Sequence, residues 1–345
     1  MVDAVPKNAR VFQLVEAGDG FDLQPHIRPL PPLKSTEVLV KVAAMSLNYR
    51  DWLIRTGSNA GRKNGLIPLS DAAGTIIDLG REARVWQTGD HVVTTFFPGW
   101  HDGRFRSAYL QNALGGGHKD GVLSEYFVAD ESDLVATPAH LSSEEAATLP
   151  CAGVTAWHAL VDRGGLRPND TVLIQGTGGV AIFALQIAVA HGARAIVLSS
   201  SDAKLVRVAH LGAWQTINYK ERTHWDQDVL DLTDGIGVDH VLELGGCGTF
   251  SRSLQAVAAG GHIAEIGLLT GSGPASPLSP LQFKNADIHG ICVGSREHQK
   301  QLSYFLEKHD IHPVVDSVYP VKEINDAYQR ISEAMHIGKI VLKGE

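Results

Sequence analysis

The chain has 345 residues, of which 44% are hydrophobic and 20% are charged, and its formal net charge is −8. This length allows two domains with a large hydrophobic core. No run of lysines and arginines occurs, which excludes nucleic acid and anionic membrane surfaces as expected partners.

The cysteines and the hydropathy indicate the compartment. Cys151, Cys247 and Cys292 are widely spaced and odd in number, which argues against both a disulfide framework and a CxxC metal site. The N-terminal residues carry no apolar leader, and no apolar stretch of about 18 residues follows. We therefore expect a cytoplasmic protein.

Residues 9 to about 135 predict a β-rich, barrel-like domain. Short alternating runs, separated by Gly, Pro and Asp turns, occur at residues 11–15, 37–42, 74–79, 91–97 and 123–128. Residues 98–121 interrupt them as a long segment with Trp100 and Tyr109. That segment is either the wall of a pocket or an ordinary surface excursion.

The pattern changes near Leu141. Ser142 and Glu145 form a capping box for a short helix, and Pro150 ends it before a second helical stretch. Strands then begin at about residues 171, 195, 215, 238, 262 and 287, with helices between most of them. This spacing is typical of βα units in one parallel sheet of six strands.

The last part of the chain alternates again. The sequence predicts a helix over 297–308, a strand over 313–319, a helix over 323–334 and a strand over 339–342. We expect this tail to return to the first domain.

Residues 171–204 read as strand, glycine turn, helix and strand. The pattern G-x-G-x-x-A starts at Gly176 and ends at Ala181, directly after a short apolar strand. One apolar face, from Val180 to Ala188, indicates a helix that ends at Gly192. Taken alone, the glycines could serve only a tight turn. In this context they predict a dinucleotide site, with the pyrophosphate held by main-chain groups of Thr177, Gly178, Gly179 and Val180.

The tip of the second strand indicates which dinucleotide is bound. A site for NAD normally carries Asp or Glu there, for the ribose 2′-hydroxyl. This chain instead has three hydroxyls and an ammonium, which suit a 2′-phosphate: Ser199, Ser200, Ser201 and Lys204. We expect NADP, with NAD possible, because Asp202 opposes the prediction unless it serves as a helix cap.

Three later strand ends also suit a ligand. Gly245 follows the fourth predicted strand, Gly267 and Leu268 follow the fifth, and Val293, Ser295 and Arg296 follow the sixth. Carboxyl ends of parallel strands meet at one edge of the sheet, so these residues predict further cofactor contacts. The alternative is that the glycines serve only their loops.

Five ordered stretches together resemble the medium-chain dehydrogenase/reductase superfamily, in its zinc-independent, quinone-oxidoreductase-like branch. They span residues 46–51, 68–74, 149–157, 176–180 and 293–297. The resemblance implies an α/β fold with a GroES-like β-barrel catalytic domain (residues 1–140, completed by 296–345). It also implies a doubly wound, six-stranded Rossmann domain (residues 141–295) and a homodimer formed near residues 270–290.

The resemblance also places the zinc ligands of related enzymes on Asn48, Ser70 and Cys151. Only the cysteine is a usual zinc ligand, so we expect no metal; Asp71 and Cys151 would be the remaining candidates. The implied catalytic residues are Asn48 and Tyr49, with Asn48 also near the nicotinamide ribose. Further implied cofactor contacts are Thr155 near the nicotinamide, Tyr219 and Lys204 at the 2′-phosphate, and Arg296 at a phosphate. For Arg50 and Asp51 we expect a structural ion pair.

These observations predict an NADPH-dependent oxidoreductase that reduces a small enone, quinone or aldehyde by hydride transfer. An alcohol dehydrogenase that works in the oxidative direction, with NAD as an alternative cofactor, is the first alternative. The second is a protein that binds NADPH without catalysis. A methyltransferase fits less well, because that fold normally has an acidic residue where Ser199 stands.

Overall fold

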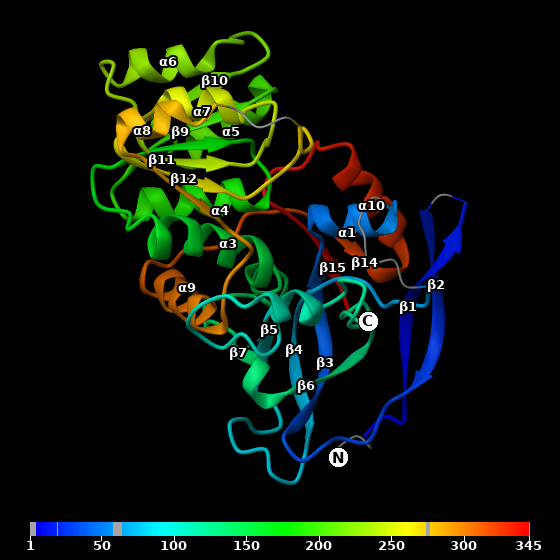
Figure 1. Cartoon of the computed structure of the whole chain (residues 1–345). Helices are drawn as coiled ribbons and strands as arrows, with labels where there is room; N and C mark the ends of the chain where they lie inside the picture. Colours follow the sequence, from blue (N-terminus) through cyan, green and yellow to red (C-terminus); the bar gives the residue numbers. More distant parts are fainter. Residues whose placement is uncertain (1–4, 19, 58–63, 274–276, 345) are drawn as a thin grey trace. The chain divides into compact units, whose positions relative to one another are not determined.

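The computed structural model describes residues 5–18, 20–57, 64–273 and 277–344 (Figure 1). The chain forms two compact units, one of Met1–Val154 with Gly294–Glu345 and one of Thr155–Val293. The expected boundaries were residues 140/141 and 295/296. Residues 141–154 fall in the first unit because α2 packs against β3 and β4 of that unit.

The first unit is built on a seven-stranded sheet. Its strand order is β14-β15-β3-β4-β5-β7. The strand β6 pairs with residues 37–41 of β3, whereas β15 pairs with residues 44–46. A separate antiparallel hairpin consists of β1 (Asn8–Ala17) and β2 (Gly20–Pro29). The sheet strands are β3 (Glu37–Ser46), β4 (Asp71–Leu79), β5 (His91–Thr94), β6 (Tyr126–Asp130), β7 (Leu134–Ala136), β14 (Val315–Pro320) and β15 (Lys339–Lys343).

The tail completes this unit, as expected. β15 pairs antiparallel with β3, so that Val341 lies opposite Ser46. The helical elements of the first unit are α1 (Tyr49–Arg55), η1 (Ser107–Asn112), η2 (Glu131–Asp133), α2 (Ser143–Ala146), η3 (Leu149–Gly153), α9 (Arg296–Lys308), η5 (Val321–Glu323) and α10 (Ile324–Ser332).

The second unit is a parallel sheet with helical crossovers, and it confirms the six expected strands. Its order is β10-β9-β8-β11-β12-β13. The strands are β8 (Thr171–Gln175), β9 (Arg194–Ser199), β10 (Gln215–Asn218), β11 (Val238–Glu243), β12 (Val257–Glu265) and β13 (Asp287–Gly290). The helices are α3 (Val154–Trp157), η4 (His158–Arg163), α4 (Gly179–Ala190), α5 (Asp202–His210), α6 (Trp225–Leu232), α7 (Phe250–Ala256) and α8 (Ser279–Lys284).

Some boundaries differ from the sequence prediction. β12 begins at Val257, five residues before the expected His262, because the strand follows α7 directly. The strands β2 and β7 were not expected. β2 is mostly exposed and carries Pro25 and Pro29, so it lacks the apolar alternation that marks a strand.

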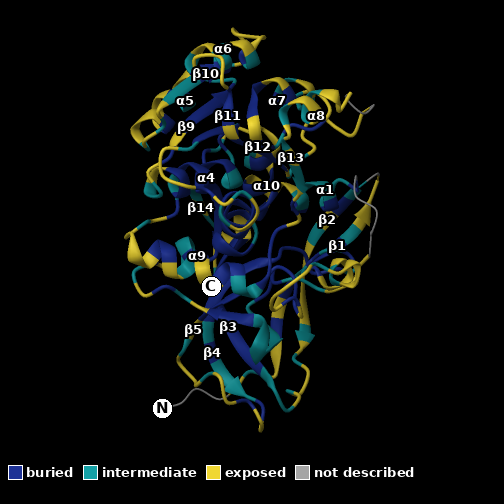
Figure 2. Cartoon of the chain, turned by 60° about the vertical axis from the view of Figure 1, so that its left-hand side comes forward, coloured by how far each residue is buried: buried dark blue, intermediate teal, exposed yellow. Residues whose placement is uncertain are grey.

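Many of the buried residues lie in the strands of the two large sheets (Figure 2). All five residues of β8 are buried, as parallel strands covered on both faces require. The prediction of a single apolar face for α4 was wrong, because Ile182 and Leu185 are buried as well as Phe183 and Ile187. Within the described ranges, no helix is both long and apolar enough to cross a lipid bilayer.

Candidate active site

The glycine turn of the second unit has the geometry expected of a phosphate-binding turn. Gly176 has φ +86°, and apart from its chain neighbours no heavy atom of a described residue lies within 4 Å of the place where a Cβ would stand. Gly178 is the N-cap of α4, and the first hydrogen bond of that helix runs from the Ile182 N–H to the Gly178 carbonyl. The amides of Gly179 and Val180 precede that bond, so they face the open end of the helix, where anions bind.

The structure brings the tip of β9 beside the end of β10. Ser199 pairs with Asn218, and the Tyr219 N–H donates to the Ser199 carbonyl at 3.1 Å. The Ser201 N–H donates to Ser199 Oγ at 3.3 Å, and the Tyr219 side chain is 41% exposed. Ser199, Ser201 and Tyr219, predicted separately, therefore lie together.

Two more predicted residues flank this strand tip. Ser201 is the N-cap of α5, and Lys204 lies in the first turn of that helix. Asp202 is the first helical residue, and its carboxylate accepts a hydrogen bond from Asn218 Nδ2 at 2.8 Å. The carboxylate that opposes an NADP site is thus held by a neighbour on β10.

Glu243 is a residue of this edge to which the sequence assigned no role of its own. It is fully buried at the end of β11 and accepts hydrogen bonds from the amides of Gly245 and Gly246, both at 2.9 Å. It also accepts hydrogen bonds from Gln175, Thr249 and Ser253. A carboxylate with this many donors holds the turn after β11 in one shape.

The loop after β12 depends on its glycine for packing. A Cβ at Gly267 would lie 2.4 Å from the Leu244 carbonyl oxygen, so no other residue fits without a shift. Leu268 beside it is 57% exposed. These facts explain Gly267 without a ligand, and the cofactor contacts of Gly245, Gly267 and Leu268 stay predictions.

The remaining predicted cofactor residues are divided between the two units. Thr155 is buried in α3, and Val293 closes the second unit with φ +54° and a carbonyl 2.7 Å from His158 Nδ1. Ser295 is the N-cap of α9 in the first unit, where its Oγ accepts from the His298 N–H. Arg296 donates from Nε to the Leu134 carbonyl at 2.8 Å. Its guanidinium is thus anchored partly to the backbone of its own unit.

The first unit contains a polar group that we call the Lys339 cluster, consisting of the buried residues Lys339, Asn48, Asp71 and Ser70 and the half-buried Cys151. The Lys339 side chain is 3% exposed at the start of β15. Its Nζ donates to the Leu47 carbonyl at 2.6 Å and to Asn48 Oδ1 at 2.5 Å, and it lies 3.8 Å from Asp71 Oδ2. The ammonium therefore joins β15 to the end of β3 and the start of β4.

Asp71 balances the charge of this cluster. It is fully buried and accepts hydrogen bonds from Ser70 Oγ at 2.6 Å and from the Cys151 N–H at 3.2 Å. Burial, and secondarily the nearby Asp71 carboxylate, raises the pKa of the Cys151 thiol well above its usual range. The thiol thus stays protonated, as the sequence interpretation of a small hydrophobic residue requires.

Asn48 presents a hydrogen-bond donor without a partner. It is 8% exposed, its Oδ1 faces Lys339, and its buried Nδ2 has no partner among the described residues. Tyr49, the other predicted catalytic residue, begins α1 and is 43% exposed. The two candidates therefore differ: one is fixed and buried, and the other reaches solvent.

The expected ion pair between Arg50 and Asp51 is confirmed. Arg50 Nε lies 3.8 Å from Asp51 Oδ1, while Arg50 Nη2 donates to the Leu114 carbonyl and the guanidinium lies over the Phe96 ring. Asp51 Oδ2 accepts from the Asn48 N–H at 2.8 Å. Asp51 thus holds the backbone of Asn48 at the start of α1.

A pH-dependent stability difference is expected for Asp51→Asn. Desolvation raises the pKa of buried Asp51 from 3.8 to about 6, in spite of the nearby Arg50. A raised carboxyl pKa contributes stability at a pH below 3.8 that is lost as the pH rises through 6. The variant should therefore exceed the wild type in free energy of unfolding by about 2 kcal/mol at high pH.

Urea denaturation at pH 8 and at pH 4 measures this difference. The advantage of Asp51→Asn should vanish at the lower pH, where the wild-type carboxyl is neutral. An advantage that is equal at both values, or larger at pH 4, would show that Asp51 does not titrate in this way.

The long segment 98–121 folds back within the first unit. Trp100 is 2% exposed and stacks on Tyr109, with 5.9 Å between ring centroids, and Phe105 meets its edge at 4.9 Å. Trp100 Nε1 donates to the Gly103 carbonyl at 3.0 Å. Three aromatic side chains of the segment therefore pack together, while most of residues 101–112 are exposed as in a surface excursion, and a pocket wall stays a prediction.

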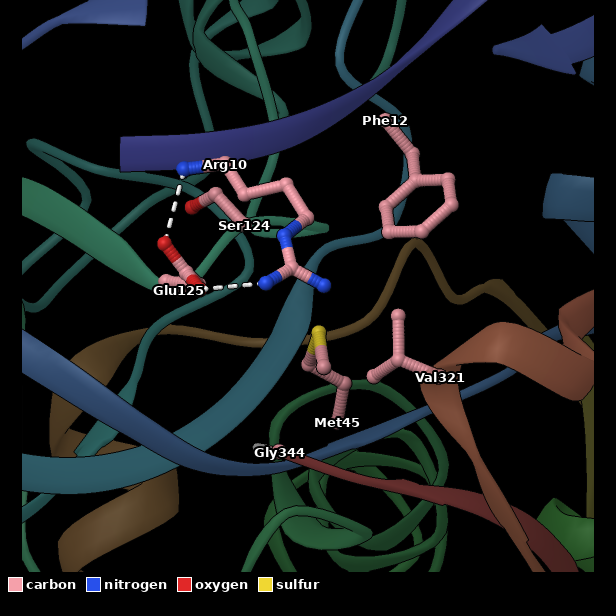
Figure 3. A pocket seen from close by; sticks show the side chains of 7 residues that line it. All are labelled: Arg10, Phe12, Met45, Ser124, Glu125, Val321 and Gly344. Carbon is pink, nitrogen blue, oxygen red and sulfur yellow. Dashed lines mark hydrogen bonds and ion pairs between the residues drawn. The ribbon is translucent and has the colours of Figure 1, made fainter. Parts of the chain in front are cut away.

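Two pockets of the first unit lie outside the Lys339 cluster. One is small and is lined mainly by Phe12, Met45 and Val321; its two charged side chains, Arg10 and Glu125, form an ion pair at 3.5 Å (Figure 3). The other contains Trp52, Arg55 and Tyr328, with Arg55 stacked over the Tyr328 ring. Neither contains a predicted catalytic residue.

Comparisons with known proteins place the chain in a family. Residues 34–139 match the alcohol dehydrogenase GroES-like domain, and residues 179–308 match the family described as zinc-binding dehydrogenase. A zinc-type alcohol dehydrogenase-like protein of Schizosaccharomyces pombe is 42% identical over 333 residues, which cover 94% of this chain and 96% of the relative.

Solved structures agree with this assignment. A candidate alcohol dehydrogenase of Sinorhizobium meliloti 1021 has a TM-score of 0.92 at 39% identity, with 99% of this chain and 100% of that chain covered. An NAD-dependent alcohol dehydrogenase has a TM-score of 0.87 at 31% identity, with 97% and 99% covered. More distant relatives, at 26% identity, are named as an acryloyl-coenzyme A reductase of Sulfurisphaera tokodaii and a 2-methylene-furan-3-one reductase of Solanum lycopersicum. The chain therefore belongs to the medium-chain dehydrogenase/reductase family, in its zinc-type alcohol dehydrogenase-like group, and is an NAD(P)-dependent oxidoreductase.

Proposed function

We propose that this protein is a zinc-independent, NADPH-dependent reductase of small carbonyl compounds, namely enones, quinones or aldehydes. The observation that carries the proposal is the buried ammonium of Lys339 beside Asn48 and Asp71, with Asn48 Nδ2 left as a donor that has no partner in the described part of the chain. A fixed donor in a buried site can stabilise the negative charge that develops on a carbonyl oxygen.

The residues at the three zinc-ligand positions do not suit a zinc ion. The oxygen of Asn48 already accepts from Lys339, the Ser70 hydroxyl donates to Asp71, and Cys151 alone of the three is a residue type that usually binds zinc. Zinc in a catalytic site needs three deprotonated or neutral donors from Cys, His, Asp or Glu. A divalent cation would also repel the buried ammonium of Lys339. The donor set therefore favours chemistry without zinc.

The second unit has residues that fit NADP. The amide groups at the start of α4 suit the pyrophosphate, and Gly176 leaves space for it. Ser199, Ser201 and Tyr219 gather at the tip of β9, with Lys204 in the next helix, and no carboxylate ends the strand. When bound, the nicotinamide ring supplies the hydride. The groups at the strand tip would select the form with a 2′-phosphate.

Residues of the first unit would serve the substrate. Asn48 Nδ2 would donate a hydrogen bond to the carbonyl oxygen as it gains charge, and Asp51 would keep the Asn48 backbone in place. Protonation after hydride transfer would come from solvent or from the exposed Tyr49 hydroxyl. Burial of the Lys339 cluster keeps water away from the donor, which strengthens its effect.

Consumption of NADPH, followed by its absorbance with a panel of quinones, enones and aldehydes, tests the proposal. We expect turnover with at least one of these classes. A protein that binds NADPH tightly and reduces none of them would contradict it.

An alcohol dehydrogenase that oxidises its substrate is the second candidate. It is favoured by the names of the relatives, one of which is an NAD-dependent alcohol dehydrogenase at 31% identity. The same assay with NAD⁺ and primary or secondary alcohols separates the two candidates. Faster turnover in that direction, with NAD⁺ preferred over NADP⁺, would favour the oxidative enzyme.

A homodimer through the second unit is proposed as well. The expected region, residues 270–290, includes residues 274–276, which lie outside the described part. In the described part, the edge strand β13 follows exposed apolar side chains at Leu268, Leu269, Leu278 and Phe283. Exposed apolar groups of this kind are typical of protein interfaces.

Phe283→Lys is expected to shift the protein from dimer to monomer. Phe283 is 84% exposed at this edge, and dimer formation would bury the charge of the lysine in the interface. Sedimentation velocity measures the change. Tyr304→Lys, at a 68% exposed aromatic residue of α9 in the other unit, is the control and should leave the mass unchanged. A wild-type monomer would refute the dimer.

A further inference from the structure

The orientation of the Asn48 side chain follows from the chemistry of its neighbour. An ammonium group has three donors and no acceptor, so the group facing it must be an oxygen. Lys339 Nζ lies 2.5 Å from Asn48 Oδ1 and 2.6 Å from the Leu47 carbonyl. The amide oxygen of Asn48 therefore faces Lys339, and the NH₂ group points away from the ammonium.

That NH₂ group is buried and without a partner among the residues that the structure describes. Most buried polar side-chain atoms in native proteins are hydrogen-bonded, and an unpaired donor carries a large desolvation cost. Asn48 is only 8% exposed, and Lys339 fixes the oxygen end of its side chain. The unpaired NH₂ group is best explained by a ligand whose acceptor atom takes its hydrogen bond.

The charge of Lys339 also acts on the strength of that donor. A cation bound to the amide oxygen draws electron density from the nitrogen, so the N–H bonds become more polar. Asp71 Oδ2 lies 3.8 Å from the ammonium, on a side chain that Ser70 and the Cys151 N–H already hold in place. The lysine thus lies buried beside a carboxylate counter-charge and next to Asn48.

Within the proposed function, on which this inference rests, we propose that Lys339 is a positioning residue for the carbonyl-reduction step. It holds the Asn48 carboxamide with its NH₂ group toward the substrate oxygen and makes that group a stronger donor. No bond to Lys339 forms or breaks, and no proton leaves it. Hydride reaches the substrate carbon while Asn48 Nδ2 donates to the oxygen that becomes negative.

A double-mutant cycle tests this role through Asn48. Lys339→Met keeps the length of the side chain and removes the charge, and we expect it to lower kcat about 10- to 100-fold. In an Asn48→Ala background the same change should lower kcat by less than about 3-fold, because the group that Lys339 positions is gone. Lys339→Arg, which keeps the donors, should recover part of the loss.

Lys284→Met is the matched control. Lys284 Nζ donates to three backbone carbonyls, those of Leu254, Gln255 and Val257, so its role is structural. Its replacement should lower the melting temperature without changing kcat. Equal losses of kcat from Lys339→Met in the wild-type and Asn48→Ala backgrounds would overturn the inference.

A second measurement does not depend on turnover. In ¹⁵N-labelled protein, the side-chain amide peaks of Asn48 are those lost in Asn48→Ala. They should shift in Lys339→Met and stay in place in Lys284→Met. Peaks that do not move in Lys339→Met would overturn the inference, as would unchanged kcat in that variant. Failure of the proposed function has a different signature, since the wild type itself would then reduce no carbonyl compound.

Discussion

Ser199→Asp is expected to raise the dissociation constant for NADPH about 30-fold and to leave that for NADH unchanged or lower. Ser199 ends β9, and its Oγ and carbonyl accept hydrogen bonds from the amides of Ser201 and Tyr219. A carboxylate there would repel the 2′-phosphate by about 2 kcal/mol at short range, which corresponds to a change of this size. It would suit the free 2′-hydroxyl of NADH, as in NAD-preferring sites.

Isothermal titration calorimetry with both cofactors measures this change of preference. Ser251→Asp adds the same charge at an exposed position of α7 in the same unit and should leave both affinities unchanged. If Ser199→Asp leaves NADPH affinity intact, the 2′-phosphate does not approach the tip of β9, and the NADP preference proposed here is wrong.

Asn48→Ala is expected to lower kcat by about 100- to 1,000-fold, the usual cost of removing one donor to a developing oxyanion. NADPH affinity should change only a few-fold, because the groups that suit the pyrophosphate and the 2′-phosphate lie in the other unit. Asn48→Asp tests the role of the NH₂ group more specifically. It keeps the shape of the side chain and an oxygen for Lys339 but has no NH₂ group.

Single-turnover kinetics at saturating NADPH measures the hydride step in these variants. Tyr49→Phe serves as the companion, since solvent can replace the exposed Tyr49 hydroxyl as a proton donor. If Asn48→Asp reduces the substrate as fast as the wild type, a donor at Asn48 is unnecessary. Unaltered rates in every variant would favour a protein that binds NADPH without catalytic use of this site.

The second unit was predictable because its architecture repeats along the chain. A parallel strand needs a crossover helix before the next strand, so the strands recur at a regular interval, and Gly176 and Gly192 mark the turns before and after the helix α4. The starts of β8, β10, β11 and β13 coincide with the expected residues. In the first unit, the predicted capping box of Ser142 and Glu145 is likewise confirmed by both of its hydrogen bonds.

The resemblance already brought Asn48, Ser70, Asp71 and Cys151 to one site, but Lys339 could not be predicted there, because its place depends on a contact between distant segments. Lys339 and Asn48 are 291 residues apart, and β15 meets β3 only once the tail has returned to the first unit. In the sequence, Lys339 is an ordinary lysine at the start of a short strand. Its burial comes from its neighbours in three dimensions. Glu243 was missed for the same reason, because its donors come from β8 and α7 as well as from its own turn.

Metal dependence tests the central claim most directly. The wild type is treated with a strong chelator, its zinc content is determined by mass spectrometry, and its rate of NADPH-dependent carbonyl reduction is compared before and after zinc is added back. We expect the full rate at far less than one zinc ion per chain and no gain on addition, because Lys339 and Asn48 supply the positive charge and the donor. A rate that falls with chelation and returns in proportion to bound zinc would contradict the account.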